Sequence, residues 1–403
     1  MKETVFTIQP TGLEERIHVL DFLRGFSLFG VLLVNMTLFR TTIFEYPRRM
    51  FDYAEVTDQW IFLIIQIFIS GKFISVLSFL FGLGFFLFME RAEQKGLSVV
   101  PLYRRRLLYL LLFGVLHLVF VWNGDILHTY ALAGLVLLWL RKKTLQTLLR
   151  WMTFFFVLSA FMAGMAAWIE FWAENMLDQK LLQQQAFYSM LAWETYSAGS
   201  FWEIVQFRFF YELPNLLVSL LYTIPFVLVL FLAGLYAGRR NIFRDIEGNL
   251  PFLRKIWLVT GVSGMVITIF YVCIELGVLQ PGLLQAAILL EVNKHISAIL
   301  LSFFYMSSLL ILLASKRISQ MVFAPLAYLG RMTLTNYLMQ SLICVFIFYG
   351  FGLGYLGKIN LAGVLALTLI IYTLQVVFSY FWLKRFRFGP MEWFWRRLTY
   401  KNI

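Results

Sequence analysis

Long apolar runs separated by short polar connections repeat along the whole sequence. A run of about 20 apolar residues is long enough to cross the hydrocarbon core of a bilayer as a helix. The runs show no period-two alternation of polar and apolar residues, which excludes the strands of a membrane β-barrel. The pattern predicts an all-α, polytopic membrane protein with about ten transmembrane helices. We expect spans over residues 20–39, 59–89, 107–122, 126–140, 150–172, 215–237, 256–277, 296–314, 333–352 and 361–383.

Lys and Arg residues are distributed unevenly between the connections on alternate sides of these spans. Five connections, the first at 89–107 and the last at 384–403, hold 23 of them, whereas the alternate five hold 7. Basic residues are concentrated in the cytoplasmic loops of membrane proteins. The bias predicts that both termini are cytoplasmic, which agrees with an even number of spans. Residues 123–125 are then expected on the outer side.

The composition agrees with a membrane protein and excludes a soluble one of this length. Of the 403 residues, 61% are hydrophobic and only 14% are charged. The formal net charge of +12 is explained by the basic loops, so no nucleic-acid partner is expected. Cys273 and Cys344 lie inside apolar runs and do not form a metal-type pair, so no metal is expected. The first apolar run carries Asp21 and Arg24, which the apolar core of a cleavable signal peptide would lack.

The whole chain, 1–403, is expected to form a single membrane-embedded domain. The longest connection, 173–214, is expected outside, either as a structured cap or as a surface helix that joins two spans. Segment 384–403 is basic and aromatic. Such segments lie at the inner membrane interface, so we expect a cytoplasmic interfacial tail.

The stretch from His117 to Tyr130 places His117, Asp125 and His128 around a Trp-Asn-Gly turn. Asp125 precedes the fourth span, where a helix N-cap belongs. If its carboxylate also contacts His117, it would orient the imidazole and stabilise its positive charge, so that His117 could act as a general base. His128, one turn into the next span, is the rival base. A hydrogen-bonded packing histidine is the alternative to a catalytic one.

The first span carries Asp21, Arg24 and Asn35. Asp21 and Arg24 are three residues apart and can pair on one helix face. Asn35 returns to the face of Arg24 about 16 Å further along the axis, and a buried amide there needs a partner in the bundle. The Asp21–Arg24 pair either sets the depth of the helix at the inner interface or binds a ligand.

The second run, 59–89, is long enough to tilt strongly or to break near Ser70 and Gly71. It also carries Lys72 near mid-depth, where a charge is costly. We expect its ammonium group to meet an anion. That anion is either a carboxylate, Asp21 or Asp125, or a ligand phosphate.

The ninth span begins with a polar stripe, with Arg331 at its inner mouth. The stripe repeats at helical spacing and predicts one polar face, which lines a cavity or packs against another polar helix. Its members are Thr333, Asn336, Tyr337 and Gln340.

Several stretches closely resemble the YeiB-like family of uncharacterised multi-spanning bacterial membrane proteins, and the resemblance covers nearly the whole chain. The matching stretches are residues 16–36, 72–84, 124–127 with 130–131, 330–337 and 389–396. This family looks distantly similar to transmembrane acyltransferases such as heparan-α-glucosaminide N-acetyltransferase. The shared part is Leu20-Asp21-x-x-Arg24-Gly25 with Val34-Asn35. The resemblance implies a multi-pass protein of the bacterial cytoplasmic membrane, acyl-CoA contacts near Arg24 and an active-site role for Asn35. In the heparan enzyme the catalytic histidine follows the first span, whereas segment 40–58 has none, so His117 or His128 must take that role.

Our leading hypothesis is a membrane acyltransferase that uses cytoplasmic acyl-CoA as cosubstrate. Its acceptor is a small molecule, a lipid or an envelope glycan on the outer side. The donor phosphates are expected against Arg24 and the inner basic loops, with Lys72 or Arg331 assisting. Asp21, beside Arg24, completes the residues expected at the cofactor. His117, oriented by Asp125, is expected to deprotonate the acceptor.

In the same hypothesis, Asn35 or Asn336 stabilises the oxyanion, and His128, Tyr337 and Gln340 complete substrate binding. The alternative is a non-enzymatic transporter or lipid-handling protein whose polar stripes line a path. The bilayer is the expected surrounding of either, and a homodimer is compatible with both.

Overall fold

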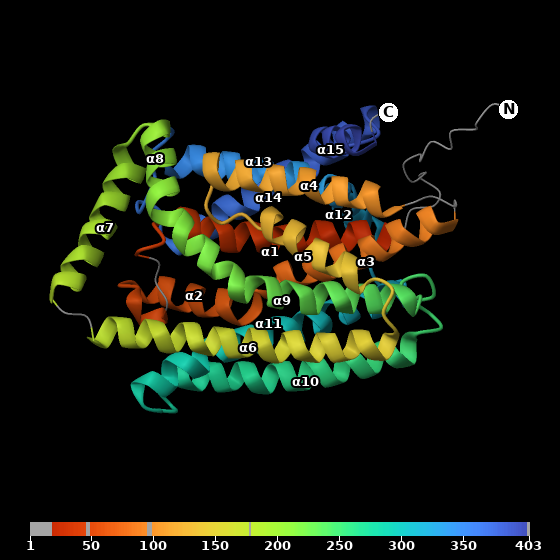
Figure 1. Cartoon of the computed structure of the whole chain (residues 1–403), viewed down its shortest axis with the longest axis horizontal. Coiled ribbons are helices and arrows are strands. Elements are labelled where there is room, and N and C mark those ends of the chain that lie inside the picture. Colours follow the sequence, from red (N-terminus) through yellow and green to blue (C-terminus); the bar gives the residue numbers. More distant parts are fainter. Residues whose placement is uncertain (1–17, 46–48, 95–98, 177–178, 401–403) are drawn as a thin grey trace.

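The computed structural model describes residues 18–45, 49–94, 99–176 and 179–400, which form a bundle of helices (Figure 1). No β-strand occurs among these residues. The helices are α1 (His18–Phe39), α2 (Val56–Phe68), α3 (Lys72–Gln94), α4 (Val99–Phe120), α5 (Leu127–Leu140), α6 (Leu145–Met176), α7 (Gln179–Ala198), α8 (Phe201–Phe207), α9 (Leu213–Arg239), α10 (Leu250–Glu275), α11 (Leu283–Ala314), α12 (Gln320–Arg331), α13 (Thr333–Phe348), α14 (Leu361–Arg385) and α15 (Pro390–Tyr400). A 3₁₀ turn (Met50–Asp52) precedes α2, and a π-helical turn (Arg208–Glu212) joins α8 to α9.

The polytopic all-α architecture is confirmed. Seven helical segments in the described part of the chain are long and apolar enough to cross a membrane. The other three expected spans correspond to α4, which carries Arg104, Arg105 and Arg106, and to the shorter apolar helices α5 and α13. The 14 residues of α5 extend only about 21 Å, less than the ~30 Å of the hydrocarbon core. This helix therefore begins inside the bundle.

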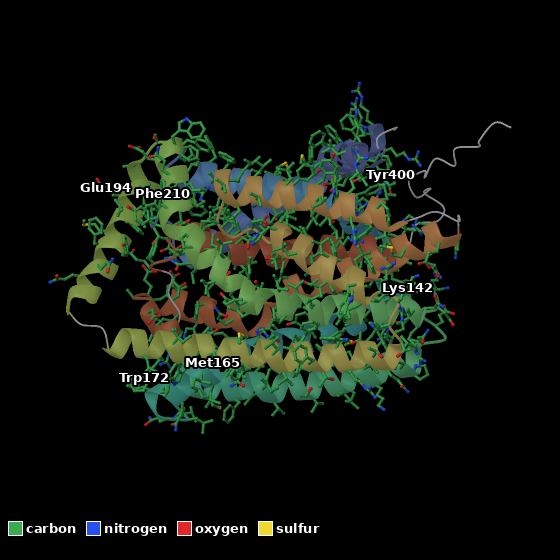
Figure 2. All side chains as sticks on the ribbon, viewed as in Figure 1. Lys142, Met165, Trp172, Glu194, Phe210 and Tyr400 are labelled. Carbon is green, nitrogen blue, oxygen red and sulfur yellow. The ribbon has the colours of Figure 1, made fainter. Side chains whose placement is uncertain are left out.

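The two ends of the bundle carry different elements. Figure 1 shows α15 at one end and α7 and α8 at the other, and we call these the α15 end and the α7 end. Lys142 and Tyr400 lie at the α15 end, and Glu194 lies at the α7 end (Figure 2). The basic connections after α5 and α14 therefore share one end, as the charge pattern predicts. That this end is cytoplasmic remains a prediction.

Three expected connections are largely helical. Segment 173–214 contains the end of α6, then α7, α8 and the π-helical turn, and residues 177 and 178 lie outside the described residues. The span expected at 296–314 begins earlier than predicted, because α11 already begins at Leu283. Most of the expected connection 278–295 is therefore helical. Within 315–332 the chain forms α12, which the hydropathy pattern missed because it has only 12 residues.

The expected break in the second run is confirmed. Helix α2 ends at Phe68 and α3 begins at Lys72, and Gly71 between them has a φ of +77°. Side chains other than glycine are strained in that region. Helix α3, which begins at this break, lines the cavity described below along most of its length.

A pair of glycines brings α1 and α12 into direct backbone contact. A Cβ atom on Gly25 would lie 1.9 Å from the Leu326 carbonyl oxygen, and one on Gly330 would lie 1.8 Å from the Asp21 carbonyl oxygen. Any larger residue at either position would force the two helices apart. The contact places Asp21 and Arg24 beside Arg331, the residue that ends α12.

Candidate functional site

A single buried carboxylate joins two histidines. Asp125 Oδ1 is 2.9 Å from His117 Nδ1, and Asp125 Oδ2 is 2.8 Å from His128 Nδ1. The His117 and Asp125 side chains are buried, and the His128 side chain is 13% exposed. A buried carboxylate requires such partners because its desolvation is otherwise unfavourable. The predicted Asp125–His117 contact is present, and the rival His128 shares the same acid.

Asp125 also caps α5, as its place in the sequence predicts. Its Oδ2 accepts a hydrogen bond of 2.9 Å from the backbone N–H of His128. This satisfies one of the free N–H groups at the helix start and places a negative charge at the positive end of the helix dipole. Gly114 on α4 makes room for the cap, because a Cβ there would lie 2.3 Å from His128 N and 2.9 Å from Asp125 Oδ2.

The turn that carries Asp125 is largely enclosed by the bundle. Gly124 at its tip is exposed, whereas the side chains of Trp122, Asn123 and Asp125 are buried. The Trp122 ring stacks on Phe39 of α1, with 4.1 Å between ring centroids. The turn is therefore held between α1 and the α7 end instead of projecting from the surface as a free loop.

A buried ion pair beside the π-helical turn anchors the same loop. Glu212 Oε2 accepts hydrogen bonds from Asn123 Nδ2 at 2.8 Å and from the Tyr196 hydroxyl at 2.9 Å. It lies 3.9 Å from Arg208 Nε, and Arg208 Nη1 donates to the Val119 carbonyl oxygen at 2.9 Å. Because breaking a buried ion pair is strongly destabilising, this network fixes the position of the Asp125 turn from the α7 end.

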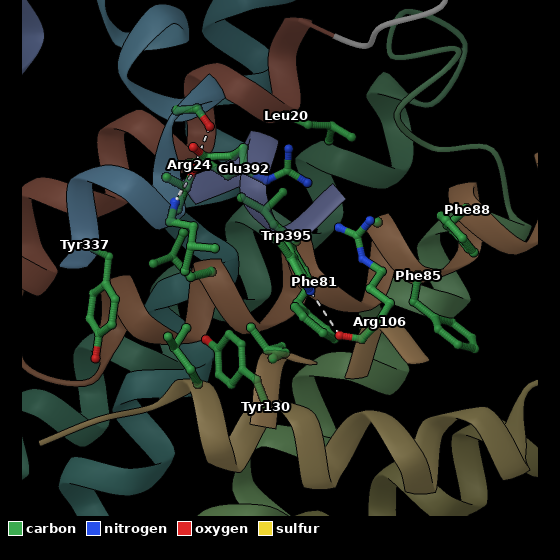
Figure 3. A pocket seen from close by; sticks show the side chains of 18 of the residues that line it. Leu20, Arg24, Phe81, Phe85, Phe88, Arg106, Tyr130, Tyr337, Glu392 and Trp395 are labelled. Atoms are coloured by element: carbon green, nitrogen blue, oxygen red, sulfur yellow. Dashed lines mark hydrogen bonds between the residues drawn. The ribbon is translucent and has the colours of Figure 1, made fainter. Parts of the chain in front are cut away.

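A cavity of about 360 Å³ opens toward the α15 end. Its walls come from α1, α3, α4, α5, α12, α13 and α15. On α3 the lining residues run from Ile74 to Ala92, which corresponds to about 27 Å along the helix axis. Figure 3 shows the labelled side chains, Arg24 and Arg106 among them, around the cavity together with Tyr130 and Tyr337.

The two ends of the cavity differ in polarity. The charged residues gather toward the α15 end, where five arginines outnumber two carboxylates among the described lining residues. They are Arg24, Arg91, Arg106, Arg331 and Arg396, with Asp21 and Glu392. The deeper walls are mainly apolar and aromatic, and the hydroxyls of Tyr130 and Tyr337 lie there; these walls include Leu28, Val31, Ile74, Leu77 and Phe81. This arrangement suits a ligand with an anionic group at one end and an apolar portion at the other.

Two arginines at the mouth are held in place by neighbours. Arg24 Nη1 donates to Asp21 Oδ1 at 3.1 Å, which confirms the predicted pair. The Arg106 guanidinium lies 3.8 Å from the centroid of the Trp395 ring, while the Trp395 indole N–H donates to the Arg106 carbonyl oxygen at 3.0 Å. Cation–π and hydrogen-bond contacts of this kind orient guanidinium groups.

Glu392 connects α15 to the start of α13. Its Oε1 accepts hydrogen bonds from the backbone N–H groups of Leu334 at 2.7 Å and Thr335 at 3.1 Å, and its Oε2 accepts one from the Thr335 hydroxyl at 2.5 Å. The residue before α13, Met332, provides no side-chain cap, so Glu392 caps this helix from 58 residues away in sequence. Burial raises the pKa of Glu392, and the hydrogen bonds from Thr335 and Leu334 act in the opposite direction.

Tyr337 lies between the cavity and the histidine pair. It lines the deep end of the cavity, and its hydroxyl is 3.5 Å from Asp125 Oδ1 and 3.4 Å from the N–H of Ile126. The ring centroids of Tyr337 and His117 are 5.4 Å apart. His117 Nε2 is buried and has no hydrogen-bond partner among the described residues. His117 itself does not line the cavity, so Tyr337 separates the imidazole from it.

The cavity brings together five of the residues singled out from the sequence. The five that line it are Asp21, Arg24, Arg331, Thr333 and Tyr337. Asp125 adjoins it through Tyr337. His117 and His128 do not line the cavity but contact the carboxylate of Asp125 behind Tyr337. Both imidazoles direct Nδ1 at the carboxylate, and no metal-holding group of three or more His, Cys, Asp or Glu residues occurs in the described ranges.

Other singled-out residues lie elsewhere. Asn35 is half-buried on α1 but does not line the cavity, and no hydrogen bond between described residues joins it to His117. Lys72 does not line the cavity. Its buried ammonium donates to the Gln66 carbonyl oxygen at 2.6 Å, where it stabilises the last turn of α2.

The polar stripe of α13 divides between two faces. Thr333 and Tyr337 line the cavity. Asn336 Nδ2 donates to Ser379 Oγ at 2.9 Å, and Gln340 Nε2 donates to Gln375 Oε1 at 2.8 Å. Ser379 and Gln375 belong to α14, so this half of the stripe is interhelical packing. The spacing along the helix predicts one polar face for these four residues, but in the structure two of them face the cavity and two face α14.

Sequence reasoning missed Arg106, Tyr130, Glu392 and Trp395 as parts of one cavity. Tyr130 and Glu392 lie in two of the stretches that resemble the YeiB-like family, so a signal was present. Arg208 and Glu212 belong to the long connection 173–214. Their burial, at 2% and 0% exposed, could not be foreseen because nothing local distinguishes them from surface charges.

Comparison with known proteins identifies the family. A protein of Bacillus subtilis (strain 168) described as "Uncharacterized protein YxaH" is 34% identical, and the match covers 98% of this chain and 96% of that protein. The chain belongs to the YeiB-like family. The YeiB protein of Escherichia coli (strain K12) is 27% identical, with 96% of each chain covered. A third relative, the "Uncharacterized 39.9 kDa protein in amylase 3'region" of Bacillus acidopullulyticus, is 29% identical over 98% of this chain and 97% of its own.

The C-terminal part of this YeiB-like chain also matches a family model. The model, described as "Protein of unknown function (DUF418)", covers residues 237–402, which include α12, α13 and α15 of the cavity wall. No solved structure matches the chain. The descriptions of these relatives name no activity.

Proposed function

We propose that this protein is a membrane acyltransferase that takes an acyl group from acyl-CoA in the cavity and transfers it to a hydroxyl or amine acceptor. The proposal rests on one relationship: a cavity rimmed by arginines ends at Tyr337, directly in front of a buried Asp125–His117 pair. Phosphates of the donor would contact Arg24 and its neighbouring arginines, because guanidinium groups match phosphate geometry. The cavity is large enough for the pantetheine arm and a short acyl group, while the adenosine would remain at the mouth.

The proposed reaction uses His117 as general base. His117 Nε2 accepts the proton of the acceptor, and the acceptor oxygen or nitrogen bonds to the thioester carbonyl carbon. The carbon–sulfur bond then breaks, and the CoA thiolate leaves and takes the proton from the imidazolium. Asp125 holds the Nδ1–H and supports the positive charge. His128, on the same carboxylate, is the alternative base.

Two features of the predicted mechanism change with the geometry. Asn35 and Asn336 do not line the cavity, so the Tyr337 hydroxyl replaces them in the proposal as the donor to the thioester oxyanion. The Tyr130 hydroxyl is already hydrogen-bonded to Ser78 and to the Ile74 carbonyl oxygen. Tyr337 must also turn aside for the thioester to reach His117. The acceptor would approach beside Gly124, the exposed residue next to Asp125.

The test is thioester cleavage by the purified protein in nanodiscs. Free CoA would be measured with acetyl-CoA and longer acyl-CoA donors, with and without simple alcohol and amine acceptors. His117→Ala should lower the rate roughly 10²–10⁴-fold. His295→Ala is the matched control, because His295 lies on α11 outside the cavity wall, and it should retain the rate. If wild type and His117→Ala neither bind nor cleave any acyl-CoA, the acyltransferase proposal is abandoned.

A transporter or lipid-handling protein is the second candidate. The observation in its favour is the interruption of two helical segments, at Gly71 between α2 and α3 and at Met332 between α12 and α13. Transporters often bind solutes at interrupted helices. Counterflow of labelled acyl-CoA or lipid in proteoliposomes, unaffected by His117→Ala, would favour this candidate over the enzyme.

A further inference from the structure

Helix α15 has two faces with different surroundings. Its inner face carries Glu392, which caps α13, and Trp395, which contacts α4. Thr399 on the same face is fully buried. Its outer face carries Trp393 and Phe394, which are 45% and 42% exposed, and the exposed Arg397. The inner face is satisfied by the bundle. On the outer face, Trp393 is exposed, and the Phe394 ring stacks on Phe113 of α4 with 5.8 Å between ring centroids while much of its surface stays exposed.

The covalent link to α14 determines where this outer face lies. Helix α14 is long and apolar enough to cross the membrane and ends at Arg385, and α15 begins at Pro390. The four linking residues can extend at most about 14 Å. The Trp382 indole N–H also donates to the Phe388 carbonyl oxygen at 3.0 Å, which fixes the link against α14. Helix α15 must therefore lie at the membrane surface where α14 leaves it.

The charges around α15 are positive on the outer side. Lys384, Arg385 and Arg387 in and after the last turn of α14 are exposed, and so is Arg397. The carboxylate of Glu392 is directed toward α13 instead. Exposed aromatic residues beside basic ones at a membrane surface fit anionic lipid headgroups, with the rings at headgroup level.

We propose that α15, together with the basic end of α14, is a docking surface for anionic phospholipid. Trp393 and Phe394 insert between headgroups, while Arg387 and Arg397 bind lipid phosphates. The inner face of the same helix contributes Trp395, Arg396 and Tyr400 to the cavity wall. Anionic lipid thus holds α15 against the mouth of the cavity. This inference is independent of whether the cavity binds acyl-CoA.

The experiment compares the full-length protein in nanodiscs of phosphatidylcholine alone and in nanodiscs that contain phosphatidylglycerol. Hydrogen–deuterium exchange is followed in peptides that cover α15. One basic residue near an anionic surface changes association about fivefold. Exchange in α15 should therefore be roughly 5–25-fold slower with phosphatidylglycerol than without it, and high salt should reduce the difference.

A double variant tests whether Arg387 and Arg397 bind the anionic lipid. Arg387→Gln with Arg397→Gln should abolish the dependence on phosphatidylglycerol while leaving exchange in α1 and α9 unchanged, which shows that the fold is kept. Lys358→Gln is the matched control, because Lys358 is exposed between α13 and α14, past the end of α13 opposite to the one that Glu392 caps, and it should leave the dependence intact. Equal exchange of wild-type α15 in both bilayers would overturn the proposal. So would a lipid dependence that survives the double variant.

Discussion

The Tyr337 hydroxyl lies 3.5 Å from Asp125 Oδ1, although 212 residues separate the two in sequence. Tyr337 lines the cavity, and Asp125 lies behind it with both histidines. One aromatic ring therefore divides an arginine-rimmed space from a buried acid–base pair. Whatever ligand the cavity holds, its access to His117 depends on this side chain.

Tyr337→Phe removes the hydroxyl and keeps the ring. The hydrogen bonds to Asp125 and Ile126 are long, so we expect a loss of only about 0.5–1.5 kcal/mol in unfolding free energy. If the hydroxyl assists the thioester oxyanion, kcat for acyl-CoA cleavage falls while the affinity for CoA stays unchanged. Calorimetric binding and a rate assay on one preparation separate these effects. A fall in affinity with kcat preserved would contradict the assigned role.

Gly114→Ala should disrupt the site, and Gly164→Ala should not. A Cβ on Gly114 would lie 2.3 Å from His128 N and 2.8 Å from its Cα, whereas the nearest side-chain atoms to a Cβ on Gly164 lie 3.5 Å away. The first change must displace the start of α5 together with the Asp125 cap. The second fills ordinary space and should raise stability by about 0.5–1 kcal/mol, because alanine favours helices. Thermal unfolding in detergent measures both, and similar effects of the two variants would refute this assignment.

Lys72→Met and Arg24→Gln should separate structure from ligand binding. Lys72 donates to a backbone carbonyl of α2, so its loss should lower stability by about 1.5–3 kcal/mol and leave CoA affinity unchanged. Arg24 lines the cavity, so its loss should weaken CoA binding measured per folded molecule. Equal effects of both variants on binding would show that Lys72 also meets the ligand.

Glu392→Ala should loosen α15 more than Glu392→Gln does. Alanine removes three hydrogen bonds to the start of α13, and loss of a helix cap costs about 0.5–2 kcal/mol. Glutamine retains an oxygen that can accept from Leu334 N–H. We expect faster hydrogen exchange at the start of α13 and in α15 for alanine, with glutamine intermediate. If the alanine variant exchanges at the same rate as the wild type, other contacts, such as that of Trp395 with α4, are sufficient to hold α15 in place.

Most of the membrane-spanning helices of this protein, and several of its local contacts, can be predicted from local sequence. Apolar runs specify which segments enter the bilayer because the free energy of burying a side chain depends mainly on the segment itself. The break at Gly71, the Asp21–Arg24 pair and the Asp125 cap were also predictable, since each involves residues within about one helical turn. The short α12 was not, because its 12 residues do not form a membrane-length run.

The composition of the site was decided by tertiary structure. Helical spacing predicts that Asn336 and Tyr337 share a polar face. Only the tertiary contacts of α13, with α14 on one side and with the Asp125 turn on the other, direct Asn336 to Ser379 and Tyr337 toward Asp125. Lys72 likewise satisfies its charge with a carbonyl at the break, a partner created by the break itself. Glu392 reaches α13 because α15 folds back across the bundle end.

Sequence alone determined that this chain is a helical membrane protein, which ends of its helices lie together, and that Asp125 and His117 can meet across one turn. Tertiary structure decided that Asp125 serves both histidines, that Tyr337 stands in front of them and that five arginines share one cavity mouth. The physical reason is the distance in sequence over which each interaction acts. Hydrophobic burial and helix capping act on neighbours in the chain, whereas a cavity depends on how helices cross, and those crossings are set by contacts such as Gly25 on Leu326.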